Sequence, residues 1–121
     1  MSNRRTAIKF PVFGYTVRVI LARNIGRTGQ RLGMNDLHDA KAAFVTDDPA
    51  PPYGWLILPL KPTPDLIAHE AAHAVRAILD RAGVGPDDET FAYHLDYLVG
   101  RVHKFVEGRR HTCSTKHKSA R

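Results

Sequence analysis

The sequence predicts an α+β domain, with a small antiparallel or mixed three-stranded sheet followed by two helices. Short segments rich in β-branched residues lie in the first half of the chain and are bounded by glycine and proline. Two longer segments, which have no proline in their interior, follow in the second half. At 121 residues the chain suffices for one compact domain, and no segment has the roughly 20 consecutive apolar residues of a membrane span.

Three strands are expected in the first half of the chain. The segment GYTVRVILAR (14–23) predicts the first strand, and NIGRTGQRLG, with three glycines, predicts a surface loop after it. Residues 42–46 and 53–60 predict the other two strands, because the proline-rich DDPAPPYG (47–54) between them is typical of a loop. A loop of this length predicts an antiparallel hairpin, and we expect the first strand to extend its sheet.

Two helices are expected in the second half of the chain. Thr63 can accept the N-cap hydrogen bond, Pro64 fits the first helical position, and Asp65 favours the positive end of the helix dipole. No breaker follows until Gly83, which is a natural C-terminal stop. A second helix is then expected over about 87–106.

The first of these helices carries an HExxH pattern, His69-Glu70-Ala71-Ala72-His73. Histidines four residues apart lie on one face of a helix, so both imidazoles can bind one Zn²⁺ at about 2.0–2.1 Å. Glu70 is the expected general base, which takes a proton from the metal-bound water and passes it to the leaving amine. The alternative is a surface helix with two solvated histidines.

A catalytic zinc site needs a third protein ligand, and the helix pattern leaves its identity open. If the two helices form a strict antiparallel hairpin that turns near residues 83–85, His73 faces about Asp96, given a rise of about 1.5 Å per residue. Asp96 is therefore a candidate ligand, or an acceptor that orients one of the two histidines. Asp88 and His94 are further candidates on the second helix.

Between about residues 53 and 100 the chain resembles the minigluzincins and the small HExxH proteins common on bacteriophages and prophages. The resemblance rests on a short sheet, the HExxH helix and the following ETFAY, which matches the ExxA pattern of the gluzincins. It implies a zincin-like fold with Glu89 as the third zinc ligand, although only 15 residues separate His73 from Glu89, fewer than the group shows. It also implies that YGWLILP (53–59) is the edge strand that pairs with an extended peptide substrate.

The resemblance implies a small zinc metallopeptidase that cuts a protein substrate with metal-activated water. Tyr93 lies one turn after Glu89 and is a candidate donor to the oxyanion that forms at the substrate carbonyl, with a core aromatic as the alternative. Imidazole and carboxylate also suit divalent metals other than zinc. The alternative function is a noncatalytic, zinc-braced binding module that contacts nucleic acid or a protein partner through a basic tail.

Positive charge is concentrated at the C-terminal end of the chain. Residues 101–121 hold seven lysines and arginines against one acid, Glu107, within a formal net charge of +6. We therefore expect a single domain over 1–108, with its core at about 14–106, and a basic, disordered tail over 109–121 that is a candidate nucleic-acid contact. The single cysteine and the absence of an apolar leader indicate a soluble cytoplasmic protein.

Overall fold

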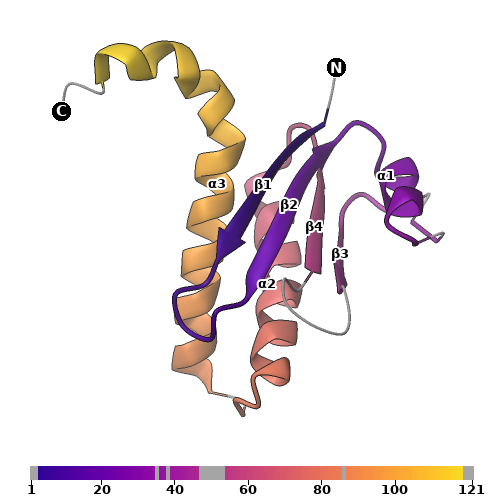
Figure 1. Ribbon diagram of the computed structural model, residues 1–121, viewed down its shortest axis with the longest axis vertical. Coiled ribbons are helices and arrows are strands. Elements are labelled where there is room, and N and C mark those ends of the chain that lie inside the picture. The colour runs from indigo at the N-terminus through magenta and orange to yellow at the C-terminus, as the bar shows by residue number, and fades with distance from the viewer. Residues whose placement is uncertain (1–2, 35, 38, 47–53, 86, 119–121) are drawn as a thin grey trace.

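The computed structural model describes residues 3–34, 36–37, 39–46, 54–85 and 87–118, with side chains as far as residue 108 except at position 46. A four-stranded sheet lies beside two long helices and one short helix (Figure 1). In chain order the elements are β1 (Arg4–Lys9), β2 (Thr16–Ala22), α1 (Ile25–Arg31), β3 (Ala43–Thr46), β4 (Gly54–Pro59), α2 (Pro64–Arg81) and α3 (Asp88–Lys118). The α+β class and the order of sheet before long helices are confirmed, but the sheet has four strands rather than three.

The sheet is mixed, with the strand order β1-β2-β4-β3. The expected antiparallel hairpin of β3 and β4 is confirmed, with Phe44 opposite Leu56, and β2 extends it by pairing parallel to β4. Because β4 is paired on both sides, the expectation that this strand is an edge is wrong. The near-continuous burial of β2 and β4 is typical of central strands, and the edges of this sheet are β1 and β3.

Two elements of the sheet layer were not expected from the sequence. β1 lies in the basic segment RRTAIK, in which exposed positions alternate with more buried ones. Its arginines and lysine are charges that edge strands often carry, and they make the strand pattern hard to recognise in the sequence. α1 replaces the expected glycine-rich loop, because the Asn24 side chain caps it by accepting a hydrogen bond from the Arg27 backbone N–H at 2.9 Å. Gly29 is buried, and a Cβ there would lie 2.7 Å from Leu37 Cδ1, so this glycine permits close packing. The segment 47–53, which was expected to be a loop, lies outside the described residues.

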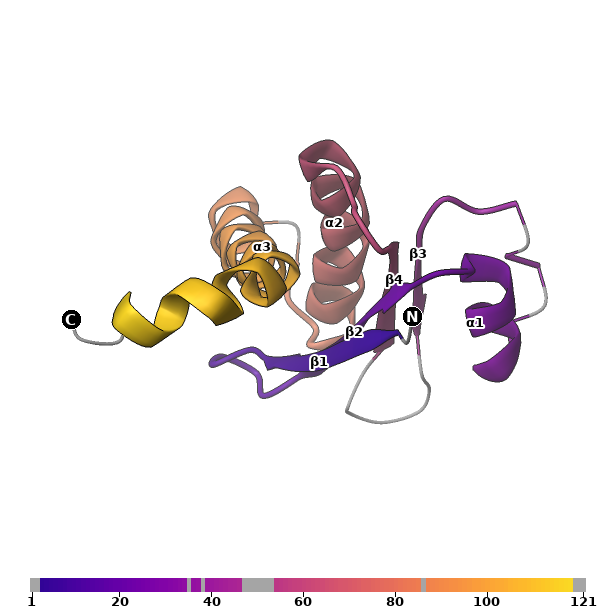
Figure 2. The same cartoon turned by 90° about the horizontal axis from the view of Figure 1, so that it is seen from above.

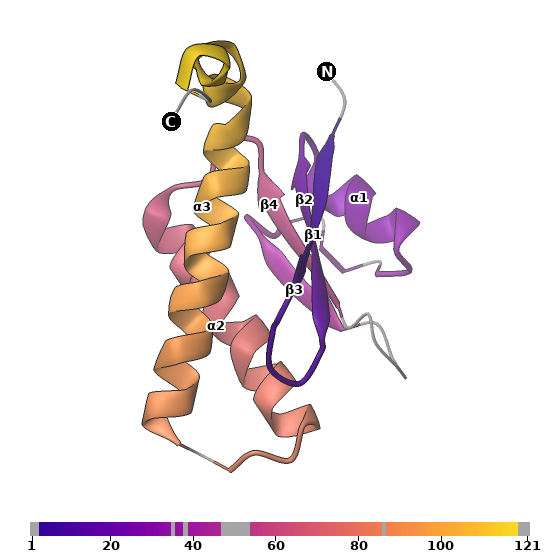
Figure 3. The same ribbon diagram turned by 60° about the vertical axis from the view of Figure 1, so that its left-hand side comes forward.

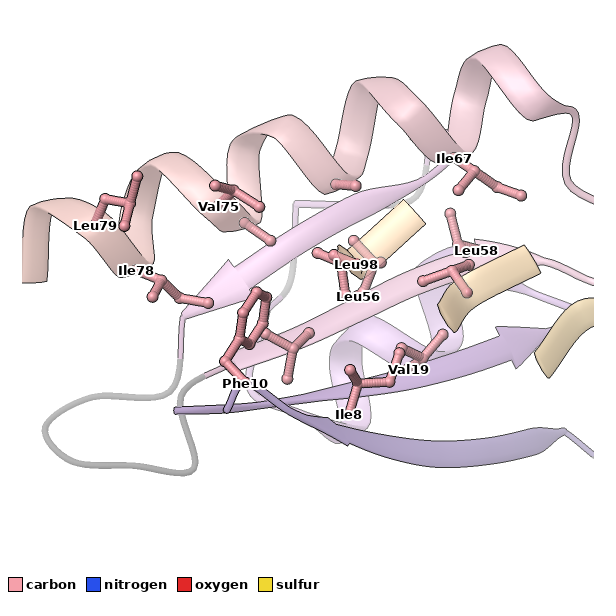
Figure 4. Close-up of a cluster of buried hydrophobic side chains, with 14 of the residues drawn as sticks. Ile8, Phe10, Val19, Leu56, Leu58, Ile67, Val75, Ile78, Leu79 and Leu98 are labelled. Atoms are coloured by element: carbon pink, nitrogen blue, oxygen red, sulfur yellow. The ribbon is translucent and has the colours of Figure 1, made fainter. Parts of the chain in front are cut away.

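Hydrophobic side chains fill both faces of the sheet. α2 and α3 lie side by side over one face, and α1 lies on the opposite face (Figures 2 and 3). The larger core lies between α2, α3 and the sheet, as Figure 4 shows for residues such as Phe10, Leu56 and Ile78. A smaller core under α1 consists of Ile20, Ala22, Val45 and Ile57. No helix in the described part of the chain is long and apolar enough to cross a membrane.

The ends of α2 confirm the local expectations. Thr63 Oγ1 accepts a hydrogen bond from the Leu66 backbone N–H at 3.3 Å, and Pro64 is the first helical residue. The hydrogen bond from the Thr63 side chain, followed by backbone hydrogen bonds, lowers the pKa of the Asp65 carboxyl below its ordinary value. The helix ends at Arg81, and Gly83 follows in the left-handed region at φ +77°.

α3 is longer than expected. It runs from Asp88 to Lys118, so its predicted end at about residue 106 is wrong. Its backbone remains helical through residues 109–118, which were expected to form a disordered tail, and residues 119–121 lie outside the described part. Leu98 and Val102 are fully buried at the middle of this helix, where it covers the sheet beside α2.

The close approach of β3 and β4 at Gly54 leads to a stability prediction. A Cβ at Gly54 would lie 2.7 Å from two ring carbons of Phe44 and 2.9 Å from the carbonyl oxygen of Val45. Gly54→Ala should therefore lower the free energy of unfolding by about 2 kcal/mol, measured by urea denaturation. Gly100→Ala is the matched control, because no atom lies within 4 Å of its added Cβ and the helix should gain about 1 kcal/mol. Equal stability of the two variants would contradict this packing.

Candidate functional site on helix α2

His69 and His73, named here the histidine pair, lie on the exposed face of α2. Their ring centroids are 4.9 Å apart and the ring planes meet at 81°. Neither imidazole has a hydrogen-bond partner among the described residues, so their ring nitrogens are available to a ligand. The opposite face of the helix packs on the sheet, which holds the backbone that carries both rings in place.

Glu70 lies on the other side of the same helical turn. It is only 9% exposed and shares the buried face of α2 with Ile67, Ala71 and Ala74. No hydrogen bond or ion pair connects it to another described residue. Among the described residues no carboxylate oxygen is both buried and without a hydrogen-bond partner, so the oxygens of Glu70 reach the protein surface while the rest of its side chain is covered.

The residue expected to be the third metal ligand, Glu89, lies away from the histidine pair. Glu89 and Asp96 both line an open pocket of about 600 Å³ next to Val12 and Phe13, in the turn between β1 and β2, and neither histidine of the pair lines this pocket. Within the described ranges, no group of three histidine, cysteine, aspartate or glutamate residues is arranged to hold a metal. The structure therefore joins neither Glu89 nor Asp96 to the histidine pair.

The rotation of α3 about its axis accounts for this separation. Phe91 is on the side of α3 that faces α2, because the Arg76 guanidinium lies 4.8 Å from the centroid of its ring. Glu89 precedes Phe91 by two residues, which corresponds to about 200° around a helix, and Asp96 lies about 140° from it. Both carboxylates consequently point away from α2. Asp88 lies nearer to α2, in a pocket with Arg76, but the histidine pair does not line that pocket either.

Tyr93, the expected oxyanion donor, is 60% exposed and lines the same open pocket as Glu89. Its ring stands edge-on to His94, with centroids 5.6 Å apart. Neither residue of the histidine pair lines this pocket. The structure thus groups Tyr93 with Glu89, as their spacing on one helix face predicted, but it does not group either of them with the histidine pair.

His94, the remaining candidate ligand, is a packed side chain under the turn between β1 and β2. It is 4% exposed and stacks between Phe10 and Phe13, with centroid distances of 5.6 and 5.5 Å. Its Nδ1 lies 2.8 Å from the carbonyl oxygen of Thr90, which favours a proton on that nitrogen. Its buried Nε2 has no hydrogen-bond partner in the described part of the chain. His94 therefore connects α3 to the β1–β2 turn.

No family model, no curated protein and no solved structure is significantly similar to the chain. The resemblance to minigluzincins therefore rests on the HExxH and ExxA residues of this sequence alone.

Proposed function

We propose that this chain is a small zinc-dependent metallopeptidase in which the histidine pair binds the metal and Glu70 is the general base. One observation carries the proposal: a mostly covered glutamate, whose carboxylate reaches the surface without a described partner, directly follows the first of two exposed imidazoles on one helix. A purely structural pair of surface histidines would not require a buried glutamate beside it.

The donor groups fit zinc in part. Two neutral imidazoles separated by one helical turn are typical zinc ligands, and a catalytic site takes a third ligand from the protein. The described residues do not supply this third ligand, so the proposal assigns only His69 and His73. When bound in such a site, zinc supplies Lewis-acid activation of water.

In this proposal Glu70 accepts the proton from water. α2 is capped at Thr63 and packs on the sheet through Ala71 and Ala74, so the backbone that carries Glu70 is held on both sides. A carboxylate in a fixed position can accept a proton from water and deliver it to a leaving amine. The small, partly exposed side chain of Ala72 leaves space along the helix beside the histidine pair.

The substrate class in this proposal is an extended peptide, and β3 is the strand that we propose pairs with it. β3 is an edge of the sheet and contacts α2, whereas β4 already has partners on both sides. The outer edge of β3 therefore offers backbone N–H and C=O groups to an incoming strand on the side of the sheet near the HExxH helix.

The proposal predicts metal-dependent proteolysis by the purified full-length chain. After dialysis against zinc-free buffer the protein should retain about one zinc ion per chain, measured by elemental analysis. It should cleave fluorescently labelled, unfolded casein, lose this activity with a chelator and regain it when zinc is restored. Cleavage that persists in the presence of the chelator would overturn the proposal. So would a protein that binds no zinc at zinc concentrations near physiological levels.

A further inference from the structure

Four arginines converge on the side of the molecule opposite α2 and α3. Arg5 from β1, Arg23 from the end of β2, and Arg27 and Arg31 from α1 line one open pocket of about 620 Å³. We name it the arginine pocket. Asn3, Asn24 and Thr28 complete its lining. Figure 3 shows α1 on the side of the sheet away from the long helices, with the start of β1 near it.

The charges of the arginine pocket are not neutralised by the described part of the protein. No acidic residue lines the pocket, and none of its four guanidinium groups forms an ion pair with a described residue. Its rim is held by neutral contacts instead: the Asn3 side chain donates to Thr28 Oγ1 at 3.4 Å and accepts from the Arg23 backbone N–H at 3.3 Å. Like charges gathered in one hollow raise the local positive potential and attract an anion.

Positive charge continues from the pocket along β1 and β2, beside α1. The Arg18 guanidinium lies 4.0 Å from the centroid of the Trp55 ring, and that of Arg5 lies 6.0 Å from the same ring. Arg5 and Lys9 are both exposed and share one face of β1, since side chains alternate along a strand. The step of four residues from Arg5 to Lys9 corresponds to about 13 Å along the strand, which is longer than a single phosphate group.

We propose that the arginine pocket and the adjoining face of β1 and β2 bind the phosphodiester backbone of a nucleic acid. Guanidinium groups bind phosphate oxygens through paired, charge-assisted hydrogen bonds. An anion with repeated phosphates matches a row of cations that extends beyond the pocket. A lipid surface matches less well, because the large exposed apolar residues Val12, Phe13 and Tyr93 do not line the pocket.

This site is independent of the proposed peptidase. α1 and α2 lie on opposite faces of the sheet, so a nucleic acid on the arginine pocket leaves the histidine pair accessible (Figure 3). It is also separate from the C-terminal end of α3, where the sequence alone suggested a nucleic-acid contact. The two regions can be distinguished by substitution.

The experiment measures binding of the full-length chain to a fluorescein-labelled oligothymidylate by anisotropy, over a range of salt concentrations. Arg27→Gln with Arg31→Gln should weaken binding about 10-fold and reduce the slope of log Kd against log salt by roughly one for each arginine removed. Both residues are exposed on α1, so circular dichroism and the melting temperature should not change. Arg5→Gln with Arg23→Gln provides a second test that leaves α1 intact.

The matched control is Lys61→Gln with Arg76→Gln, which removes the same charge from exposed positions that do not line the arginine pocket. This control, and Arg109→Gln with Arg110→Gln in the C-terminal segment, should each retain affinity within about 3-fold. Equal loss in all variants, or unchanged binding in both pocket variants, would overturn the proposal. So would binding to phosphatidylserine vesicles that is tighter than to the oligonucleotide and depends on Arg27 and Arg31, because it would assign the pocket to a membrane.

Discussion

Replacing His73 with alanine should lower the affinity of the protein for zinc by roughly 100-fold or more, because even the loss of a residue that orients a metal ligand costs about 10- to 100-fold. His69→Ala should have the same effect, since the two rings lie 4.9 Å apart on one face of α2 and both are proposed ligands. Both side chains are exposed, so the free energy of unfolding of the metal-free protein should change by less than about 0.5 kcal/mol. The affinity is measured by competition with a chromophoric zinc chelator.

Two control variants test whether the loss of zinc affinity is specific to the histidine pair. His103→Ala removes another helical histidine and should leave zinc affinity unchanged, because His103 lies on α3. Glu89→Gln should also leave it unchanged, because the structure places Glu89 in the open pocket next to Phe13. A loss of zinc in Glu89→Gln would show that α3 rotates to bring this carboxylate to the histidine pair. Unchanged affinity in both His69→Ala and His73→Ala would exclude the proposed metal site.

Replacing Glu70 with glutamine should abolish casein cleavage while zinc remains bound. The amide has nearly the same shape as the carboxylate but cannot accept the proton, and general-base catalysis contributes about 10²- to 10⁴-fold. The free energy of unfolding should change by less than about 0.5 kcal/mol, because the amide has nearly the same shape and the carboxylate that it replaces reaches the surface. Cleavage rate, zinc content and urea denaturation are measured on the same preparation.

Glu107→Gln is the matched control, because it makes the same chemical change at an exposed position of α3. It should leave cleavage, zinc content and stability unchanged. A Glu70→Gln variant that cleaves casein as fast as the natural protein would contradict the role of general base. A variant that unfolds more easily and loses zinc would instead assign Glu70 to the structure, and would favour the noncatalytic, zinc-braced module.

The features that depend on neighbouring residues were predictable from the sequence. The cap at Thr63, the start of α2 at Pro64 and the stop before Gly83 depend only on local hydrogen bonds and backbone angles, and all three are confirmed. The hairpin of β3 and β4 also depends on a short connection. The i, i+4 spacing placed the two histidines on one helix face, because helical geometry is the same in every protein context.

The sequence pattern was misleading where packing between distant segments competes with local propensity. NIGRTGQRLG has the glycine content of a loop, but its Asn24 cap and the burial of Gly29 against Leu37 stabilise the short helix α1. RRTAIK has the charge of a flexible end, but it gains hydrogen bonds as the partner of β2 and its Ile8 enters the main core. These packing contacts and hydrogen bonds involve residues outside the segment itself, so the local sequence of the segment does not predict them.

Local patterns thus determined the α+β class, the HExxH helix and the adjacency of His69, Glu70 and His73. Pairing and packing over long distances decided the rest. β4 became a central strand because β2 pairs with it in parallel, which leaves β3 as the edge near α2. The burial of Leu98 and Val102 in the main core fixes the rotation of α3 and directs Glu89 away from the histidine pair. The packing of α1 against β4 gathers four arginines that are spread over residues 5–31.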